Sequence, residues 1–145
     1  MFLALLAPVA LASVAYAADL KPAQEEAKTK FDVMAKSMTT EINAACGTKF
    51  DTIKTDFENY DASHFTRQAP GTVCSELTYD LKEICKSAPY KKALQSKIKT
   101  VSCMMKASSG PQLEVTRGGV VLHLNQDQSA SGAVGINVIK AALDK

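Results

Sequence analysis

The sequence contains no tryptophan, and aromatic residues make up only 6% of its 145 residues. Proteins that bind single-stranded nucleic acid stack the bases on aromatic side chains that lie among basic ones. The most basic part of this chain has no such interleaving, and the net charge of +2 is small. We therefore expect no nucleic-acid partner, and the net charge by itself indicates no particular partner.

Residues that hold metals or cofactors are also scarce. The chain has two histidines, and no two of its four cysteines form a C-x-x-C pair, so the sequence predicts neither a zinc site nor a cofactor. It contains no G-x-S-x-G nucleophile motif. A serine- and glycine-rich run at residues 129–135 has no lysine, which a phosphate-binding loop requires. No motif therefore identifies an enzyme.

Residues 1–17 contain no charged residue, and they end in the small-x-small sequence Ala15-Tyr16-Ala17. An apolar stretch followed by such a site predicts a secretory signal peptide over residues 1–17, although its basic start is missing. The alternative is a membrane anchor, which needs about 20 apolar residues. We expect an exported domain over residues 18–145, either periplasmic or secreted, with no stable membrane span after cleavage.

Four cysteines in an exported chain of this size predict two disulfides. Cys74 and Cys85 are eleven positions apart. On one helix they would lie about 16 Å apart, whereas a disulfide needs Cα atoms within about 7 Å. A reversal of the chain at Ser87–Pro89 brings Cys103 opposite Cys74 and leaves Cys46 for Cys85. We predict the pairs Cys74–Cys103 and Cys46–Cys85; the pairs Cys46–Cys74 and Cys85–Cys103 are the alternative.

Apolar residues at helical spacing predict several helices. The first covers residues 22–46, because Pro22 suits a first turn and Gly47 suits the left-handed residue that follows a helix. Two more lie on either side of Ser87–Pro89, since the residue before a proline avoids helical geometry. Their short connection should make them antiparallel. A last helix is expected near the C-terminus, with three inward-facing residues, Ile136, Ile139 and Leu143.

Strand patterns lie mostly in the last third of the chain. Residues 48–60 fit either a helix or a strand, and their threonines favour a strand. Residues 100–106 alternate apolar and polar side chains, which is typical of a strand in a sheet. Further along, Gly118-Gly119 is the predicted two-residue loop of a β-hairpin. In that register Leu113 faces Leu124 on the apolar side of the hairpin.

These elements predict an α+β fold. We expect a single domain with an antiparallel sheet, a hairpin in the C-terminal half, and covering helices tied by two disulfides. In the hairpin register given above, Glu114 faces His123 on the outer side. An imidazole beside a carboxylate resembles a general base and its orienting group, although cross-strand pairs of this kind are common on surfaces. The pair is a weak candidate site.

The order of the cysteines and their neighbours resembles that in a set of uncharacterised exported bacterial proteins. The residues that carry the likeness are Cys46-Gly47-Thr48-Lys49, then Cys74 and Cys85, then the run from Lys97 to Cys103 before a glycine-turned hairpin. The resemblance covers most of the expected domain. It implies a strand after the Cys-Gly-Thr-Lys element and a helix that closes the chain. No activity is attached to the set.

Charge is distributed unevenly along the chain. From Lys82 to Lys106 there are seven lysines and one acidic residue, Glu83. Four of these lysines lie on or just after one predicted helix: Lys91, Lys92, Lys97 and Lys99. Such a run is common on solvated faces, but it also suits an anionic partner, such as an envelope component or an acidic protein.

Two functions therefore fit the sequence. We predict a non-catalytic exported binding or interaction module, whose anionic partner would contact the basic region from Lys82 to Lys106. The alternative is a small exported hydrolase with His123 near its site.

Overall fold

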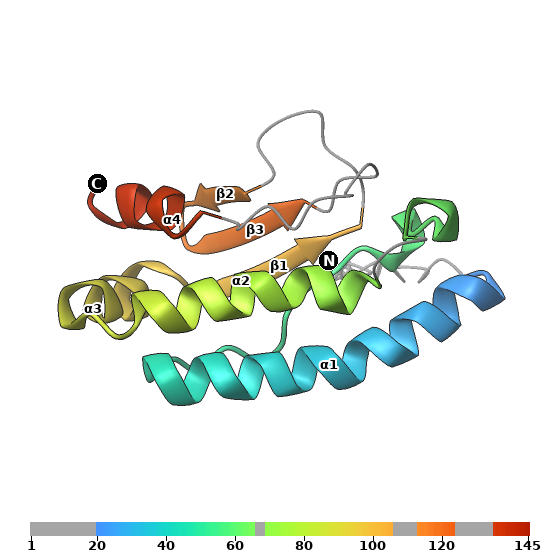
Figure 1. Ribbon diagram of the computed structural model, residues 1–145, viewed down its shortest axis with the longest axis horizontal. Helices are drawn as coiled ribbons and strands as arrows, with labels where there is room; N and C mark the ends of the chain where they lie inside the picture. The colour runs from blue at the N-terminus through green and yellow to red at the C-terminus, as the bar shows by residue number, and fades with distance from the viewer. Residues whose placement is uncertain (1–19, 66–68, 106–112, 124–134) are drawn as a thin grey trace, which may run out of the picture.

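The computed structural model describes residues 20–65, 69–105, 113–123 and 135–145 (Figure 1). The predicted signal peptide lies outside this part of the chain. The elements of the described part, in chain order, are α1 (Pro22–Cys46), η1 (Phe57–Asn59), η2 (Ala62–Phe65), α2 (Pro70–Ile84), α3 (Ala88–Lys97), β1 (Thr100–Met104), β2 (Leu113–Thr116), β3 (Gly119–His123) and α4 (Ile136–Leu143). The predicted α+β fold class is confirmed.

Helix α1 begins and ends where the sequence predicts. Pro22 occupies its first turn, where a backbone N–H would have no helical partner. At the other end Gly47 has a φ of 66°, in the left-handed region, and its N–H donates to the carbonyl oxygen of Asn43 at 2.8 Å. A residue with a Cβ is disfavoured in this conformation, so the glycine ends the helix.

Helices α1 and α2 lie side by side and run in the same direction, with α2 between α1 and the sheet (Figure 1). One face of α1 supplies a buried stripe that repeats every three or four positions, Phe31, Ala35, Met38, Ile42 and Cys46. The facing residues of α2 are also buried, among them Leu77 and Leu81, with 1% and 0% of their surface exposed. The helices therefore share one hydrophobic core.

Both predicted disulfides are confirmed. Cys46 is bonded to Cys85 with 5.2 Å between their Cα atoms, and Cys74 is bonded to Cys103 with 6.2 Å. The reversal of the chain occurs at Ser87, the N-cap of α3. Helix α3 ends at Lys97, and strand β1, which follows it, brings Cys103 to Cys74.

The sheet is mixed, which corrects the predicted antiparallel sheet. Its strand order is β1-β3-β2: β3 pairs antiparallel with β2 but parallel with β1. Close approach of β3 to the start of β1 depends on Gly119, because a Cβ there would lie 2.8 Å from the hydroxyl of Thr100. The carbonyl of Gly118 also accepts the backbone N–H groups of Lys99 and Thr100, at 2.6 and 3.1 Å. These contacts place β3 in the centre of the sheet.

The hairpin register also differs from the prediction. Thr116 pairs with Gly119, so the two turn residues are Arg117 and Gly118, and Gly118 has a φ of 92°. Leu113 therefore faces Leu122. Because the shift is by two residues, the apolar residues stay on the buried side of the sheet, as the two-residue repeat of a strand requires.

Residues 48–60 form one bridge and a short helical turn rather than the predicted strand. Lys54 alone pairs with β1: its N–H donates to Val101 at 3.0 Å, and its carbonyl accepts from Cys103 at 2.8 Å. The chain then leaves the edge, because the buried side chain of Asp56 accepts the N–H of Met105. A side chain thus takes the place of the next backbone hydrogen bond.

The C-terminal helix α4 packs as predicted. Ile139 and Leu143 are buried and Ile136 is partly buried against the core. The N-cap of this helix is Gly135, with a φ of 75°.

Removing either disulfide should lower the free energy of unfolding by about 3.5–4 kcal/mol, because the bonds close loops with sequence separations of 39 and 29 residues. Both cysteines of one pair are replaced by alanine, which leaves no free thiol, and urea unfolding measures the loss. Peptide mapping of the unreduced wild-type protein is the control. A peptide that joins Cys74 to Cys85 would contradict the described pairing.

Candidate functional site

The four predicted lysines do not form one surface. Lys91 donates to the carbonyl oxygen of Ala45 at 3.0 Å, at the end of α1. Lys97 donates to the carbonyl oxygen of Leu143 at 2.5 Å, at the end of α4. Lys92 is exposed, and its side chain makes no hydrogen bond or ion pair with a described residue. The lysine run in the sequence is thus divided among different parts of the fold.

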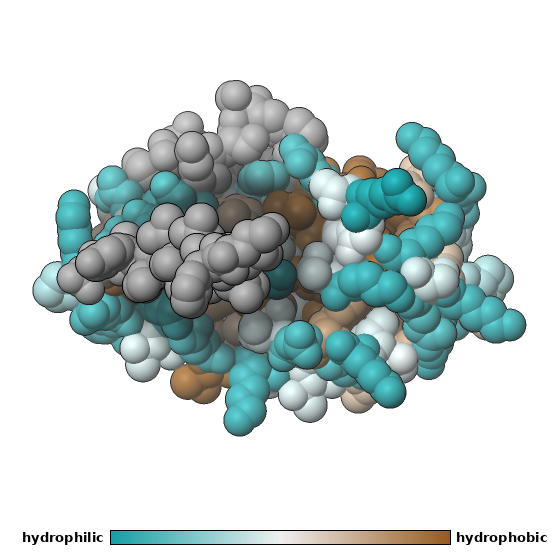
Figure 2. Space-filling view, turned by 180° about the vertical axis from the view of Figure 1, so that it is seen from behind, coloured by the Kyte–Doolittle hydropathy of each residue, from teal (hydrophilic) through white to brown (hydrophobic). Residues whose placement is uncertain are grey.

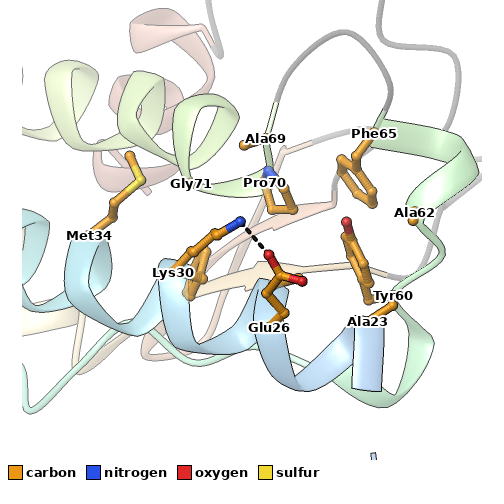
Figure 3. A pocket seen from close by; sticks show the side chains of 12 residues that line it. Ala23, Glu26, Lys30, Met34, Tyr60, Ala62, Phe65, Ala69, Pro70 and Gly71 are labelled. Atoms are coloured by element: carbon orange, nitrogen blue, oxygen red, sulfur yellow. Dashed lines mark hydrogen bonds and ion pairs between the residues drawn. The ribbon is translucent and has the colours of Figure 1, made fainter. Parts of the chain in front are cut away.

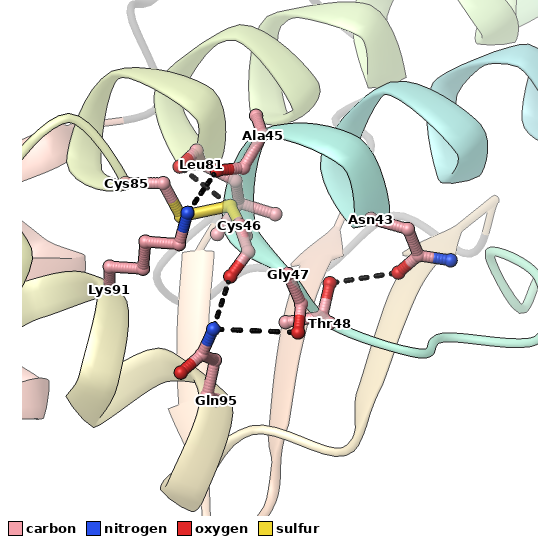
Figure 4. Close-up of a disulfide and its surroundings, with 9 residues drawn as sticks. All are labelled: Asn43, Ala45, Cys46, Gly47, Thr48, Leu81, Cys85, Lys91 and Gln95. Atoms are coloured by element: carbon pink, nitrogen blue, oxygen red, sulfur yellow. Dashed lines mark hydrogen bonds between the residues drawn. A yellow bond between two sulfur atoms is a disulfide. The ribbon is translucent and has the colours of Figure 1, made fainter.

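Two side chains of α3 donate hydrogen bonds to the last carbonyl groups of α1 (Figure 4). Besides the bond from Lys91, the side-chain amide of Gln95 donates to the carbonyl oxygen of Cys46 at 2.7 Å. The last carbonyls of a helix have no partner within the helix and carry partial negative charge, so an ammonium group and an amide stabilise them. Lys91 therefore has a structural role next to the Cys46–Cys85 disulfide.

Lys97 and Lys99 line a concave cavity of about 630 Å³, which we call the basic groove. Three segments form it: the junction of α3 and β1, the turn between β2 and β3, and the end of α4. Its lining residues are Ser96, Lys97, Ile98, Lys99, Val115, Thr116, Arg117, Gly118, Ala142, Leu143 and Lys145. The volume lies within the range of about 300–1,000 Å³ that is usual for small-molecule sites.

The lining of the basic groove is cationic on every segment. It contains Lys97, Lys99, Arg117 and Lys145, and no acidic residue. None of these four side chains forms an ion pair with a residue in the described ranges. Figure 2 shows hydrophilic side chains projecting at the end of the molecule that carries α3 and α4, with apolar atoms between them. Such a concave surface concentrates positive potential and attracts anions.

Sequence reasoning missed half of this cluster. Arg117 and Lys145 are 28 positions apart and neither belongs to a basic run. Arg117 reaches the groove only because it lies in the hairpin turn, and Lys145 only because α4 packs beside β2. The available signal was the position of Arg117 beside a turn glycine, which places a side chain at the edge of a sheet.

Glu114 and His123 meet, but not directly across the hairpin. Glu114 faces Val121, and its carboxylate lies 3.6 Å from the Nε2 of His123, a diagonal neighbour. The His123 side chain is 22% exposed, and its Nε2 is buried without a hydrogen-bond partner. Among the described residues, no serine or threonine hydroxyl bonds to either side chain. The pair therefore lacks a nucleophile there.

A second cavity of about 380 Å³ lies beside the N-terminal half of α1 (Figure 3). Its wall includes the stacked rings of Tyr60 and Phe65, with centroids 5.2 Å apart. Its two charged residues, Glu26 and Lys30, form an ion pair of 2.6 Å, and the hydrogen bond from Lys30 lowers the pKa of Glu26. This cavity is aromatic and electrically neutral, in contrast to the basic groove.

Helix α2 carries one buried acid. The Asp80 side chain is 5% exposed, and its Oδ2 has no hydrogen-bond partner. Burial raises the pKa of Asp80, and burial together with the Asp80 charge raises the pKa of Glu76, one helical turn away. Neither acid lines the basic groove.

No protein-family model, curated protein or solved structure matches the chain. In the described ranges, no three His, Cys, Asp or Glu side chains gather in a way that would hold a metal ion. None of the helices described there combines the length and apolar character needed to cross a membrane.

Lys91→Met should lower the free energy of unfolding by about 1 kcal/mol, because the carbonyl of Ala45 loses its charged donor. Methionine keeps most of the aliphatic length, so the loss reports on the amine. Lys92→Met is the matched control, since Lys92 is adjacent and exposed without a described partner. Urea unfolding of both variants is the measurement. Equal losses would contradict the structural role of Lys91.

Asp80→Asn should make the protein more stable at pH 7, by on the order of 1 kcal/mol, since an unpartnered buried charge is removed. The raised pKa of Asp80 means that the native state keeps a proton that the unfolded chain releases near the usual value of 3.8. Stability should therefore fall as the pH rises from about 4 through the raised pKa. The variant should lose this dependence, measured by urea unfolding between about pH 4 and pH 7.5.

Glu76→Gln is the control for that experiment, because Glu76 is only partly buried and should contribute less. If Asp80→Asn were less stable than the wild type at pH 7, the carboxylate would have a stabilising partner, contrary to the described geometry.

Proposed function

We propose that the protein is a non-catalytic binding module that holds an anionic group of its partner in the basic groove. The observation that carries this proposal is the convergence of Lys97, Lys99, Arg117 and Lys145 on one cavity without an acidic residue. Bringing four like charges together costs free energy in the absence of a counter-charge. A bound anion would remove that repulsion.

The rigidity of one wall supports the proposal. Lys97 and Lys99 lie between Cys85 and Cys103, each of which is disulfide-bonded to another element. The ammonium of Lys97 is further held by the carbonyl of Leu143. A site whose charges are already in place loses less conformational freedom on binding.

The compartment narrows the choice of partner. Two disulfides indicate an oxidising environment, and we propose that the chain is exported to the periplasm or the medium, as its apolar N-terminal sequence predicts. Both an anionic envelope component and an acidic protein fit the charge. The groove favours the envelope component, because a small concave cavity suits a headgroup better than a broad protein surface.

The hydrolase alternative has less support. The basic groove contains no histidine, and the Glu114–His123 pair has no described nucleophile. A hydrolase of this kind needs all three groups within reach of one another.

The proposal predicts salt-sensitive binding of an anion at the groove. Inorganic pyrophosphate is titrated into the ¹⁵N-labelled full chain, and we expect amide shifts centred on residues 97–100 and 116–118. Raising the salt from about 50 to about 300 mM should weaken the binding, since exposed charges are screened. The double variant Lys99→Glu/Arg117→Glu should bind at least about tenfold more weakly.

The matched control is Lys36→Glu/Lys92→Glu. It changes the net charge by the same amount at exposed positions that do not line the groove. Equal weakening by the two double variants would mean that only the total charge matters, and the site would be rejected. Shifts spread over the whole chain would have the same meaning.

A further inference from the structure

The basic groove has an apolar floor beneath its cations. Ile98 and Leu143 line it from the core, each with 3% of its surface exposed, and Val115 and Ala142 line it as partly exposed residues. A purely hydrophilic anion would pair with the lysines but would cover these apolar atoms without benefit. The lining therefore has both cationic and apolar surface, and we expect a ligand that has both an anionic and an apolar part.

We infer that the ligand of the basic groove is a monomeric amphiphile with one anionic headgroup and an apolar tail. This inference rests on the proposed function, since it names the ligand class of the same site. The tail would lie over the apolar floor, and the headgroup would meet the ammonium and guanidinium groups.

The headgroup would meet donors on the lining side chains. The backbone N–H groups of Lys99 and Thr100 already donate to the carbonyl of Gly118, so neither is available to a ligand. The ammonium groups of Lys97 and Lys99 each donate one hydrogen bond to a carbonyl, of Leu143 and Gln95. An ammonium group has three donors, so each keeps two for a ligand. Ammonium donors suit a carboxylate, sulfate or phosphate headgroup alike.

The aliphatic stems of the cations extend the apolar surface. Lysine and arginine bury their methylene groups along apolar surface while the charged end stays in water. Lys99 flanks the groove from the junction of α3 and β1, and Arg117 flanks it from the hairpin turn. Their stems can cover a tail on its open side, and the charged ends then lie where the headgroup leaves the groove.

The second cavity, beside α1, differs from the basic groove in its charge. It is smaller and aromatic, and its Glu26–Lys30 ion pair cancels the charge at its edge. An uncharged apolar ligand would prefer that cavity, whereas an anionic amphiphile gains only at the basic groove. Comparing ligand binding at the two cavities therefore tests whether the charge of the lining determines the preference for an anion.

The test is a titration of the full chain with octanoate, decanoate and dodecanoate, each below its micelle concentration. Decanol and decyltrimethylammonium are the chain-matched controls without negative charge. We expect the affinity to rise by about fourfold for each methylene group buried, with amide shifts at residues 97–100 and 115–118. Both controls should bind at least about tenfold more weakly there.

Two variants of the protein separate the contribution of the ligand's headgroup to binding from that of its tail. Lys99→Glu/Arg117→Glu should abolish the preference for decanoate over decanol. Val115→Thr, which keeps the side-chain shape but replaces a methyl group by a hydroxyl, should reduce the gain per methylene and leave pyrophosphate binding unchanged. Thermal unfolding of each variant confirms that it is folded.

The outcomes are distinguishable. If pyrophosphate binds at the groove but affinity does not rise with chain length, the amphiphile inference is overturned while the proposed function stands. If neither probe binds, both fall. Equal binding of decyltrimethylammonium and decanoate, or amide shifts centred on Tyr60 and Phe65, would also overturn the inference. So would association with anionic phosphatidylglycerol vesicles without binding of any monomeric probe.

Discussion

Helix α2 is covalently held near both of its ends, and most of the fold depends on this constraint. Cys74, in the second turn of α2, is bonded to β1, and Cys85, the C-cap residue directly after α2, is bonded to α1. The helix therefore cannot separate from the sheet on one side or from α1 on the other. The 17 residues between Cys85 and Cys103 are fixed at both ends, and they include α3 and two of the three lysines of the basic groove, Lys97 and Lys99.

The parallel arrangement of α1 and α2 brings two partial negative charges together, and side chains of α3 stabilise them. Two parallel helices place their negative ends together, next to the Cys46–Cys85 disulfide (Figure 4). Lys91 and Gln95 reach across from α3 to the last carbonyls of α1. Lys82 also pairs with Glu41 between the two helices, at 2.6 Å. Part of the lysine-rich composition is thus required by the fold and needs no partner.

Local signals predicted the helices and the disulfides well. The bounds of α1 follow from Pro22 and Gly47, whose backbone preferences act within one turn. The rigid length of one helix keeps Cys74 away from Cys85, and the chain reversal at Ser87–Pro89 favoured the observed pairs over the one remaining alternative. The helix bounds depend on interactions within a few residues, and the disulfide pairs depend on the length of one rigid helix and on the chain reversal that follows it.

The sheet and the groove depend on contacts between distant segments. The alternation of apolar and polar residues predicts a strand but not which strand it pairs with. The parallel pairing of β1 with β3 could therefore not be predicted from the sequence. Gly118-Gly119 suggested a turn of two glycines, but Gly119 is needed for the close contact with Thr100. Arg117 and Lys145 reach the groove through tertiary packing alone. No local pattern could have joined them to Lys97 and Lys99.

The two disulfide loops overlap, and this has a consequence for proteolysis. One loop spans residues 46–85 and the other spans residues 74–103. A single break in the backbone anywhere between residues 46 and 103 therefore leaves one covalently joined molecule. A break between residues 104 and 112 instead leaves the hairpin and α4 on a fragment with no disulfide to the rest of the chain. The basic groove thus has one wall, at Lys97 and Lys99, that a single cut cannot detach, and another, at Arg117 and Lys145, that it can.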